Sequence, residues 1–276
     1  MDTEQAAATP GSAARWGPLW GARPEDWALS EDQQVPTYEA ALRHVALESG
    51  SRVLDVGCGA GAFLSLVAGL GAEPFGIDAS PELIAFARER LPAADLRVGE
   101  MEDLPFEDDT FDLVTGFNSF FFADDMVAAL REAGRVAKPR APVVVQVWGA
   151  HEQCDLEEMK TIARPFLPPR PPGAPPDPDL SEPGVLRALV EEAGGLVPES
   201  EFDVSWAFEY QDAETLGRAL VAVAGLATLA GPGRESELKA AIVAGLAPYR
   251  RADGGYRLEN EYRYLVARAS NEAAAP

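Results

Sequence analysis

The sequence predicts an α/β protein built on a Rossmann-like, mostly parallel sheet of seven strands with an antiparallel last strand. Two observations carry this prediction. From Ser51 onward, short runs that favour β-structure alternate with helical stretches, which is typical of parallel strands joined by crossover helices. A glycine-rich run, VLDVGCGAGAF at residues 53–63, then joins the first strand to the first of these helices. Such a turn occurs in many folds that hold a nucleotide-like ligand.

The individual elements follow from this alternation. Strands are expected at residues 51–57, 73–78, 94–100, 111–117 and 141–149, and two further strands, 199–210 and 256–269, close the sheet. Helices are expected at 61–70, 80–91, 124–137 and 181–194. Ser80 precedes Pro81 and Glu82, and a capping side chain, a proline and an acid in this order are typical of a helix start. Ser181 is expected to cap the last helix, and Gly194 or Gly195 to end it.

Segments outside this alternation divide the chain further. Residues 1–40 are expected to form an N-terminal cap segment, and residues 41–276 the main domain. Within that domain, residues 150–180 and 212–255 are expected to serve as lid elements. The first includes the proline-rich run 165–178, which suits neither a helix nor a central strand, and the second carries two helical stretches.

Composition argues against several classes of function. The 276 residues carry a formal net charge of −22 with a pI near 4.4, so the surface repels phosphate backbones and no nucleic-acid partner is expected. Cys58 and Cys154 are the two cysteines, and they indicate neither a disulfide framework nor a metal site. The N-terminal residues are acidic and polar, unlike a signal peptide, and no run approaches 18 apolar residues. These features predict a cytoplasmic protein with no membrane partner.

The glycine turn fits two kinds of ligand. The spacing Gly57-x-Gly59-x-x-Ala62 satisfies the dinucleotide fingerprint, so a nicotinamide cofactor stays open. Asp55 argues against that alternative, because a carboxylate two residues before Gly57 would approach a diphosphate unfavourably but would suit a cationic group. Asp78 ends the second strand, where an acid can accept hydrogen bonds from ribose hydroxyls, which both ligands have.

With its acid included, the run Asp55-x-Gly57-x-Gly59-x-Gly61 resembles motif I of the class I S-adenosylmethionine-dependent methyltransferases. Residues 98–114, VGEMEDLPFEDDTFDLV, are similar to this family's third-strand end, usually written GDAExLPF, and to the strand that follows. Residues 130–149 resemble its fourth crossover helix and fifth strand, although the usual KPGG turn is KPRA at residues 138–141. The resemblance covers about residues 50–150 and fits the small-molecule group of the family.

The resemblance implies S-adenosylmethionine as the cofactor. Glu100 stands where the family has an aspartate that accepts from the adenine amino group, with the Met101 amide facing the ring edge. Because glutamate is one methylene longer, the choice among Glu100, Glu102 and Asp103 stays open. The expected cofactor-binding residues are Asp55, Gly57, Cys58, Gly59, Gly61, Asp78, Ala79, Glu100, Met101, Glu102 and Asn118.

The methyl acceptor is expected to be a small, largely apolar metabolite, because the segments outside the shared core are rich in apolar residues. An oxygen acceptor is expected first, a carbon of a quinone-like ring next, and nitrogen last. The expected acceptor-binding residues are Trp20, Ser119, Phe122 and Trp148, with core packing as the alternative for the aromatic ones. His151, directly after the fifth strand, is the candidate catalytic base.

The predicted function is therefore methyl transfer from S-adenosylmethionine to this small-molecule acceptor (EC 2.1.1.-). Two alternatives stay open: an NAD(P)-dependent oxidoreductase, and a non-methylating cyclase or binding protein on a methyltransferase scaffold. The sequence does not identify the acceptor or the oligomeric state, so a homodimer stays open as well.

Overall fold

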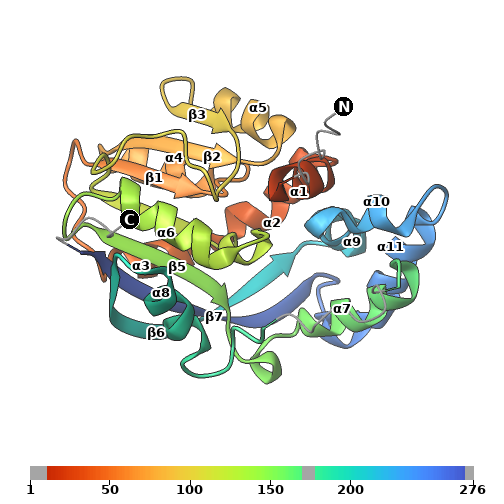
Figure 1. Ribbon diagram of the computed structural model, residues 1–276. Coiled ribbons are helices and arrows are strands. Elements are labelled where there is room, and N and C mark those ends of the chain that lie inside the picture. The colour runs from red at the N-terminus through yellow and green to blue at the C-terminus, as the bar shows by residue number, and fades with distance from the viewer. Residues whose placement is uncertain (1–10, 170–177, 271–276) are drawn as a thin grey trace, which may run out of the picture.

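The computed structural model describes residues 11–169 and 178–270, which are built around one central sheet (Figure 1). The seven strands lie in the order β3-β2-β1-β4-β5-β7-β6. They are β1 Arg52–Val56, β2 Glu73–Asp78, β3 Asp95–Val98, β4 Leu113–Phe117, β5 Pro142–Trp148, β6 Leu196–Tyr210 and β7 Tyr256–Ala269. Strands β1 to β5 pair in parallel, whereas β7 is antiparallel to both β5 and β6. The predicted fold class is confirmed.

Alternate residues of each strand face two separate layers of helices. Val53 of β1 belongs to a core shared with α3 Val35–Leu42, α4 Ala62–Gly69 and α5 Pro81–Arg90. Leu54, its neighbour, faces the opposite core, which is shared with α6 Met126–Val136 and α8 Val185–Ala193. Because both faces of the sheet are covered, the central strands read as nearly continuous apolar runs.

The strand order reverses between β1 and β4, which are neighbours in the sheet although β2 and β3 separate them in the chain. In open α/β sheets, loops diverge at such a switch point and leave a crevice beyond the carboxyl ends of the strands. The glycine turn after β1 and residues 118–119 after β4 flank this crevice.

The predicted helix boundaries are partly right. The Ser80 side chain caps α5 and accepts a hydrogen bond from the Leu83 amide at 3.1 Å. Ser181 does not cap α8, because its hydroxyl and amide both donate to the Asp179 carboxylate. The helix begins instead after Gly184, whose φ of +84° suits glycine, and it ends at Gly194 as predicted.

The KPRA turn before β5, residues 138–141, has no glycine, and Arg140 takes the conformation that a glycine would favour. Arg140 adopts a left-handed backbone with a φ of +67°. Its amide donates to the carbonyl of Ala269 at the end of β7, at 2.9 Å. The turn is thus held by the neighbouring strand despite a conformation that favours glycine.

Helices outside the sheet layers come from three segments of the chain. The cap contains α1 Ser12–Trp20, α2 Pro24–Glu31 and the 3-10 turn η1 Asp32–Gln34. Residues 150–169 form η3 His151–Gln153, α7 Glu157–Ala163 and η4 Arg164–Phe166, and residues 170–177 of the predicted proline loop lie outside the described residues. Between β6 and β7 lie α9 Ala213–Ala222, η5 Val223–Gly225, α10 Leu226–Ala230, α11 Glu235–Gly245 and η6 Ala247–Tyr249.

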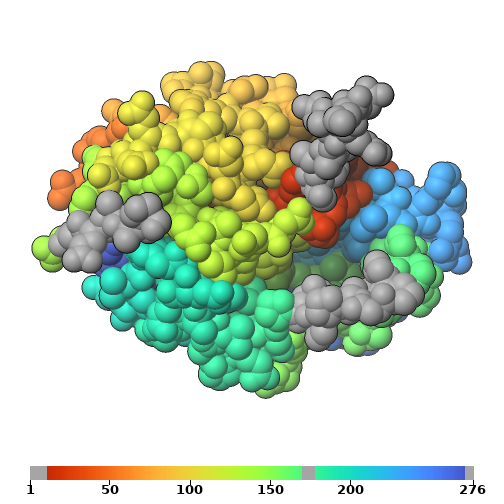
Figure 2. Space-filling model, viewed as in Figure 1, coloured from red at the N-terminus to blue at the C-terminus, as the bar shows by residue number. Residues whose placement is uncertain are grey.

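The cap and the segment between β6 and β7 meet beyond the carboxyl ends of the strands. A Cβ atom added to Gly225 would lie 2.6 Å from the Leu19 Cβ, so α1 and η5 are in close contact. Figure 2 shows the red surface of the cap bordering the blue surface of residues 213–249. Segments far apart in the sequence therefore meet above the carboxyl ends of the strands.

One stretch of the described chain, Ala213–Ala230, is long and apolar enough to cross a membrane by length and composition alone. More than half of this window, 56%, is buried inside the fold, as in the core helix of a globular protein. The backbone also breaks within it, since Ala224 has a φ of +48° between α9 and α10.

Candidate active site

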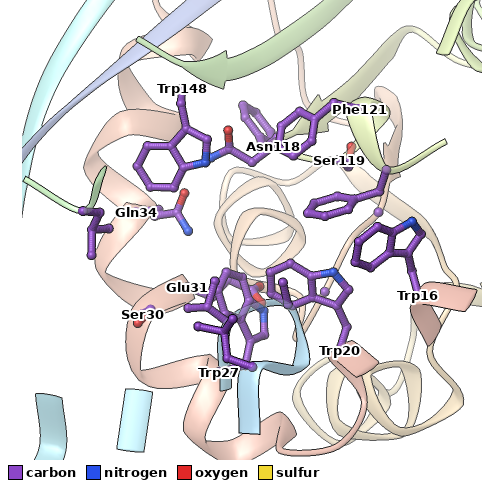
Figure 3. Close-up of a pocket in the computed structure, with 18 of the residues that line it drawn as sticks. Trp16, Trp20, Trp27, Ser30, Glu31, Gln34, Asn118, Ser119, Phe121 and Trp148 are labelled. Carbon is purple, nitrogen blue, oxygen red and sulfur yellow. The ribbon is translucent and has the colours of Figure 1, made fainter. Parts of the chain in front are cut away.

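A cavity of about 490 Å³ lies beyond the carboxyl ends of β1, β2 and β4. Its walls come from the cap, from the turns after these strands, from α7 and from the segment around η5 (Figure 3). A cavity of this size and position is typical of a small-molecule site.

The glycine turn after β1 forms the floor of the cavity. Gly57, Gly59 and Gly61 all have positive φ angles, of +78°, +54° and +85°. A Cβ atom on Gly57 would lie 2.4 Å from the Ser119 Cβ, so only glycine permits this approach of the β1 and β4 loops. The amides of Gly57 and Cys58 both donate to the Ile77 carbonyl, at 2.8 and 3.0 Å. These contacts fix the turn against its two neighbouring strands.

Two carboxylates predicted from the sequence line the cavity beside this turn. Asp55 is 3% exposed and accepts a hydrogen bond of 2.6 Å from the Thr115 hydroxyl. Asp78 accepts from the amides of Gly59 and Ser80, both at 2.9 Å. Burial raises the pKa of both carboxyls, that of Asp55 well above its usual range, and the neighbouring acids Glu31 and Asp78 raise the pKa of Asp55 further.

A third carboxylate, which the sequence did not indicate, comes from the cap. Glu31, the last residue of α2, is 4% exposed and lines the cavity. Its oxygens accept hydrogen bonds from the amides of Ala60 at 2.7 Å and Ala62 at 2.8 Å, where α4 begins. Burial raises the pKa of Glu31 to about 7, against the lowering effect of these two amides. Nothing in the polar run EDQQ around it distinguishes this acid from its exposed neighbours.

These three acids make one end of the cavity strongly acidic. Within the described residues, no lysine, arginine or histidine forms an ion pair with Glu31, Asp55 or Asp78. Buried carboxylates are costly to keep ionised unless a positive charge or hydrogen-bond donors face them. This end therefore suits a cationic ligand and disfavours a diphosphate.

The residues predicted to receive adenine divide into two groups. Ala79 and Met101 line the cavity, together with Leu83 and Trp16. Glu100 and Glu102 are not among the lining residues, because α1 engages both: the Ser12 hydroxyl donates to each, and the Ala13 amide donates to Glu100 at 2.8 Å. The structure thus shows the first turn of α1 in contact with the acids that the resemblance assigned to the adenine amino group.

Gly61 is likewise absent from the lining residues. It stands immediately before α4, and a Cβ atom there would lie 3.2 Å from the Ala87 Cβ. Its position supports a role in closing the turn and packing α4 against α5. The other cofactor residues predicted from the sequence, Asp55, Gly57, Cys58, Gly59, Asp78, Ala79, Met101 and Asn118, do line the cavity.

Aromatic rings form much of the rest of the cavity wall. Trp20 contacts Trp27 and Phe122 edge-on, with ring centroids 4.7 and 5.4 Å apart, and Trp16 contacts Phe122 at 4.8 Å. Trp148 stacks on Tyr262 at 5.0 Å. All four residues predicted to contact the acceptor, Trp20, Ser119, Phe122 and Trp148, line the cavity. The Ser119 hydroxyl is already engaged, since it donates to the Val56 carbonyl at 2.6 Å.

Several polar groups in this wall have no partner among the described residues. Nε1 of Trp16 and Oδ1 of Asn118 are buried and form no hydrogen bond there. Gln34, in η1, is 5% exposed, and its side-chain amide points into the cavity without a hydrogen bond to the described chain (Figure 3). Unpaired buried polar groups are unfavourable, so these atoms are suited to a ligand's hydrogen bonds.

His151, the predicted base, is not among the described residues that line this cavity, and its catalytic role stays a prediction. The ring lies in η3 with its side chain 53% exposed, and its nitrogens face Asp179 at 3.0 Å and Glu157 at 3.3 Å. The loop after β5 carries it away from the strand ends, and the position of β5 alone could not show this. In this geometry His151 links Asp179 to the start of α7, where Glu157 lines the cavity.

The sheet order, the antiparallel β7 and the acidic turn beyond β1 together define the architecture of a class I methyltransferase. Residues 54–145 match the family model described as a methyltransferase domain. This part of the chain is therefore a methyltransferase domain, and the methyl donor of such domains is S-adenosylmethionine.

Curated relatives share this core with the chain. A ubiquinone biosynthesis O-methyltransferase of Xanthomonas oryzae pv. oryzae is 41% identical over 126 residues, which cover 41% of this chain and 52% of the relative. A demethylmenaquinone methyltransferase of Tropheryma whipplei is 32% identical over 140 residues, which cover 50% of this chain and 55% of the relative. The chain thus spans about half the length of the curated relatives it matches.

Solved structures resemble the fold over most of the chain. A chain from a complex with the Haloferax volcanii Trm112 methyltransferase activator aligns with a TM-score of 0.60 and 22% identity, covering 95% of this chain and 99% of that one. The [4+2]-cyclase SpnF aligns with a TM-score of 0.54 and 22% identity, covering 85% of this chain and 81% of the cyclase. At this level of identity the likeness concerns the fold alone.

Proposed function

We propose that this protein transfers a methyl group from S-adenosylmethionine to a small, largely apolar metabolite, at an oxygen atom in the first instance and at a ring carbon in the second. The observation that carries the proposal is a single cavity with an acidic end at the glycine turn and a largely aromatic and apolar wall around the rest of it. A cationic donor and an apolar acceptor can meet there.

The residues at the acidic end fit the donor. S-adenosylmethionine supplies an activated methyl group on a positively charged sulfur, next to an ammonium and a ribose. Asp55 and Asp78 offer carboxylate oxygens to such groups from the ends of adjacent strands. The unpartnered Oδ1 of Asn118 offers a further acceptor between the donor end and the aromatic wall.

The aromatic wall fits the acceptor. Beyond the tryptophans and phenylalanines, the cavity is lined by apolar side chains such as Leu156, Met159 and Phe208. Flat, apolar molecules bind to such walls, and a few polar groups fix their orientation. The names of the two relatives refer to ubiquinone and demethylmenaquinone, which supports a quinone-type or phenolic acceptor.

Orientation and exclusion of water suffice for catalysis in this proposal. The leaving group is already activated, so holding donor and acceptor in line can supply up to roughly 7–11 kcal/mol of the barrier reduction. Among the described residues that line the cavity there is no histidine, so general-base catalysis by an imidazole is not part of the proposal.

Binding and product assays test the proposal separately. Isothermal titration should show binding of S-adenosylmethionine and S-adenosylhomocysteine and no binding of NAD⁺ or NADP⁺. Incubation with S-adenosylmethionine and a panel of phenols, hydroquinones and quinones should then yield S-adenosylhomocysteine and a methylated product. Binding of a nicotinamide dinucleotide in place of S-adenosylmethionine would refute the donor assignment.

The same assays discriminate the remaining alternative. A cyclase or binding protein on this scaffold would bind S-adenosylmethionine but would form no S-adenosylhomocysteine across the panel. The likeness to SpnF does not favour that alternative, because it extends to the fold only.

A further inference from the structure

We infer that Glu31 is a further residue of the donor site, where its carboxylate holds the cap on the glycine turn and faces the positive charge of the donor. The inference rests on the proposed function and extends it. Glu31 lies outside residues 54–145, the part of the chain that matches the family model.

The turn and the carboxylate are complementary in shape and charge. The two Glu31 oxygens take the amides of Ala60 and Ala62, which are donors that the start of α4 would otherwise present to an anion. A Cβ atom on residue 59 would lie 2.6 Å from Oε2 of Glu31, so Gly59 makes room for this contact. With Glu31 in place, a ligand phosphate has no access to these amides.

The charge of Glu31 is incompletely balanced by the protein. The titratable groups that interact with it are Asp32 on its own segment, Tyr38 on α3, Asp55 on β1, Cys58 in the turn and Arg90 on α5. The one cation in this set, Arg90, forms its ion pair with Asp32 at 2.6 Å. Two amides therefore hold a buried carboxylate among other acids, and a cationic ligand would supply the missing charge.

An independent observation points to a ligand site next to Glu31. Gln34 follows it by three residues, is 5% exposed, and directs an amide without a hydrogen-bond partner in the described chain into the same cavity (Figure 3). Ser30, the residue before Glu31, also lines the cavity. The segment 30–34 thus contacts the donor end through Glu31 and the acceptor wall through its neighbours, so seating Glu31 on the turn also positions part of the acceptor wall.

Proton release on binding of the donor is the measurable consequence of this role of Glu31. A buried carboxyl with a pKa of about 7 is largely protonated below neutral pH, whereas a cationic ligand favours its ionised form. Binding of S-adenosylmethionine near pH 6.5 should therefore release a proton from Glu31. The donor's own ammonium contributes little, because an ordinary α-amino group titrates at about 7.7–8.0.

The experiment compares the full-length wild type, Glu31→Gln and Glu25→Gln by isothermal titration with S-adenosylmethionine, in two buffers of different ionisation enthalpy. Glu25 is an exposed acid on the same helix and serves as the matched control. We expect Glu31→Gln to bind about tenfold or more weakly and to release fewer protons than the wild type, because the amide cannot ionise. Any release that remains would come from Asp55, whose pKa burial also raises. Glu25→Gln should behave as the wild type.

A measurement on the wild type covers the case in which Glu31→Gln does not fold. Its affinity for S-adenosylmethionine should rise with pH between about 5.5 and 7 and level off above. Above pH 7 most of the free protein already has Glu31 ionised, so binding no longer has to remove its proton. An affinity independent of pH, or a Glu31→Gln variant that binds as tightly and releases as many protons as the wild type, would overturn this inference alone. A wild type that does not bind S-adenosylmethionine would overturn the proposed function as well.

Discussion

The buried carboxylate of Asp55 is unfavourable for the free protein but is suited to binding a cationic ligand. Its carboxylate is almost inaccessible, and a single hydroxyl, that of Thr115, donates to it from the adjacent strand. Burial raises its pKa, so the ionised form is unfavourable in the absence of a ligand. A residue that is unfavourable for the free protein and lines a cavity is typical of a binding site.

We predict that Asp55→Asn weakens binding of S-adenosylmethionine about tenfold or more, or about 1.4 kcal/mol, because a neutral amide no longer faces the donor's positive charge. The same change should not lower the melting temperature of the free protein, because it removes a buried charge. Isothermal titration and thermal unfolding measure the two effects. Asp112→Asn, which removes an acid at the opposite end of the sheet, is the control. Unchanged affinity in Asp55→Asn would contradict our placement of the positive charge.

At this scale the sequence revealed some site residues and not others, for a physical reason. Asp55 and Asp78 follow apolar strand runs, so their position at one edge of the sheet follows from the fold. No strand or motif precedes Glu31 to indicate its position. It lies in a polar stretch whose burial results from tertiary packing. Glu100 was identified from its place in the motif, but its contact with Ser12 of α1 depends on a segment 88 residues earlier in the chain.

Among the elements, periodic ones were predictable and their interruptions were not. All seven strands were expected, since alternation and apolar runs depend on local sequence. The stretch 214–229 reads as one helix, yet it is divided at η5, where Ala224 and Gly225 both have positive φ angles. Nothing in the local sequence marks Ala224 for this conformation. The break lies where η5 contacts α1, a contact between distant parts of the chain.

We predict that Gly225→Ala destabilises the protein more than Gly231→Ala. Both glycines have positive φ angles, +67° and +87°, so both changes cost about 1 kcal/mol of backbone strain. At Gly225 the added Cβ would also lie 2.8 Å from the backbone of Leu19, whereas at Gly231 no atom lies within 4 Å. Overpacking typically adds roughly 1–3 kcal/mol.

Chemical denaturation of the two variants measures this difference. Because the clash at Gly225 falls between α1 and η5, the same change should also loosen the cap and weaken binding of S-adenosylmethionine, whereas Gly231→Ala should leave affinity unchanged. Equal destabilisation by the two substitutions would show that the cap does not rest on η5.

For the molecule as a whole, the cavity exists only through long-range assembly. Its walls run from Ser12 to Leu226, and they bring together the cap, the open edge of the sheet and the segment between β6 and β7. The strands and the glycine turn could be predicted from local patterns, so one side of the cavity could be as well. The opposite side could not, because nothing local specifies which loops and cap residues meet across the edge.

The net charge of −22 sets a further property of the whole molecule. With 45 acidic against 23 basic residues, repulsion among surface carboxylates opposes the compact state, and exposed ion pairs each contribute little in return. Added salt screens this repulsion over about 10 Å at 0.1 M. We predict that raising NaCl from about 20 to about 500 mM at neutral pH increases the melting temperature by a few degrees, since about 1 kcal/mol corresponds to roughly 2–4 °C in chains of this size.

The pH dependence of this salt effect separates screening of net charge from general effects of salt on solvation. Near the pI of about 4.4 the molecule carries little net charge, so the gain from salt should shrink steadily as the pH is lowered from 7.5 toward 5.5. Thermal unfolding followed by circular dichroism at both pH values and both salt concentrations measures it. A melting temperature that falls with salt at pH 7.5, or a gain of equal size at pH 5.5, would show that the ion pairs or salt-specific hydration outweigh the repulsion among the carboxylates.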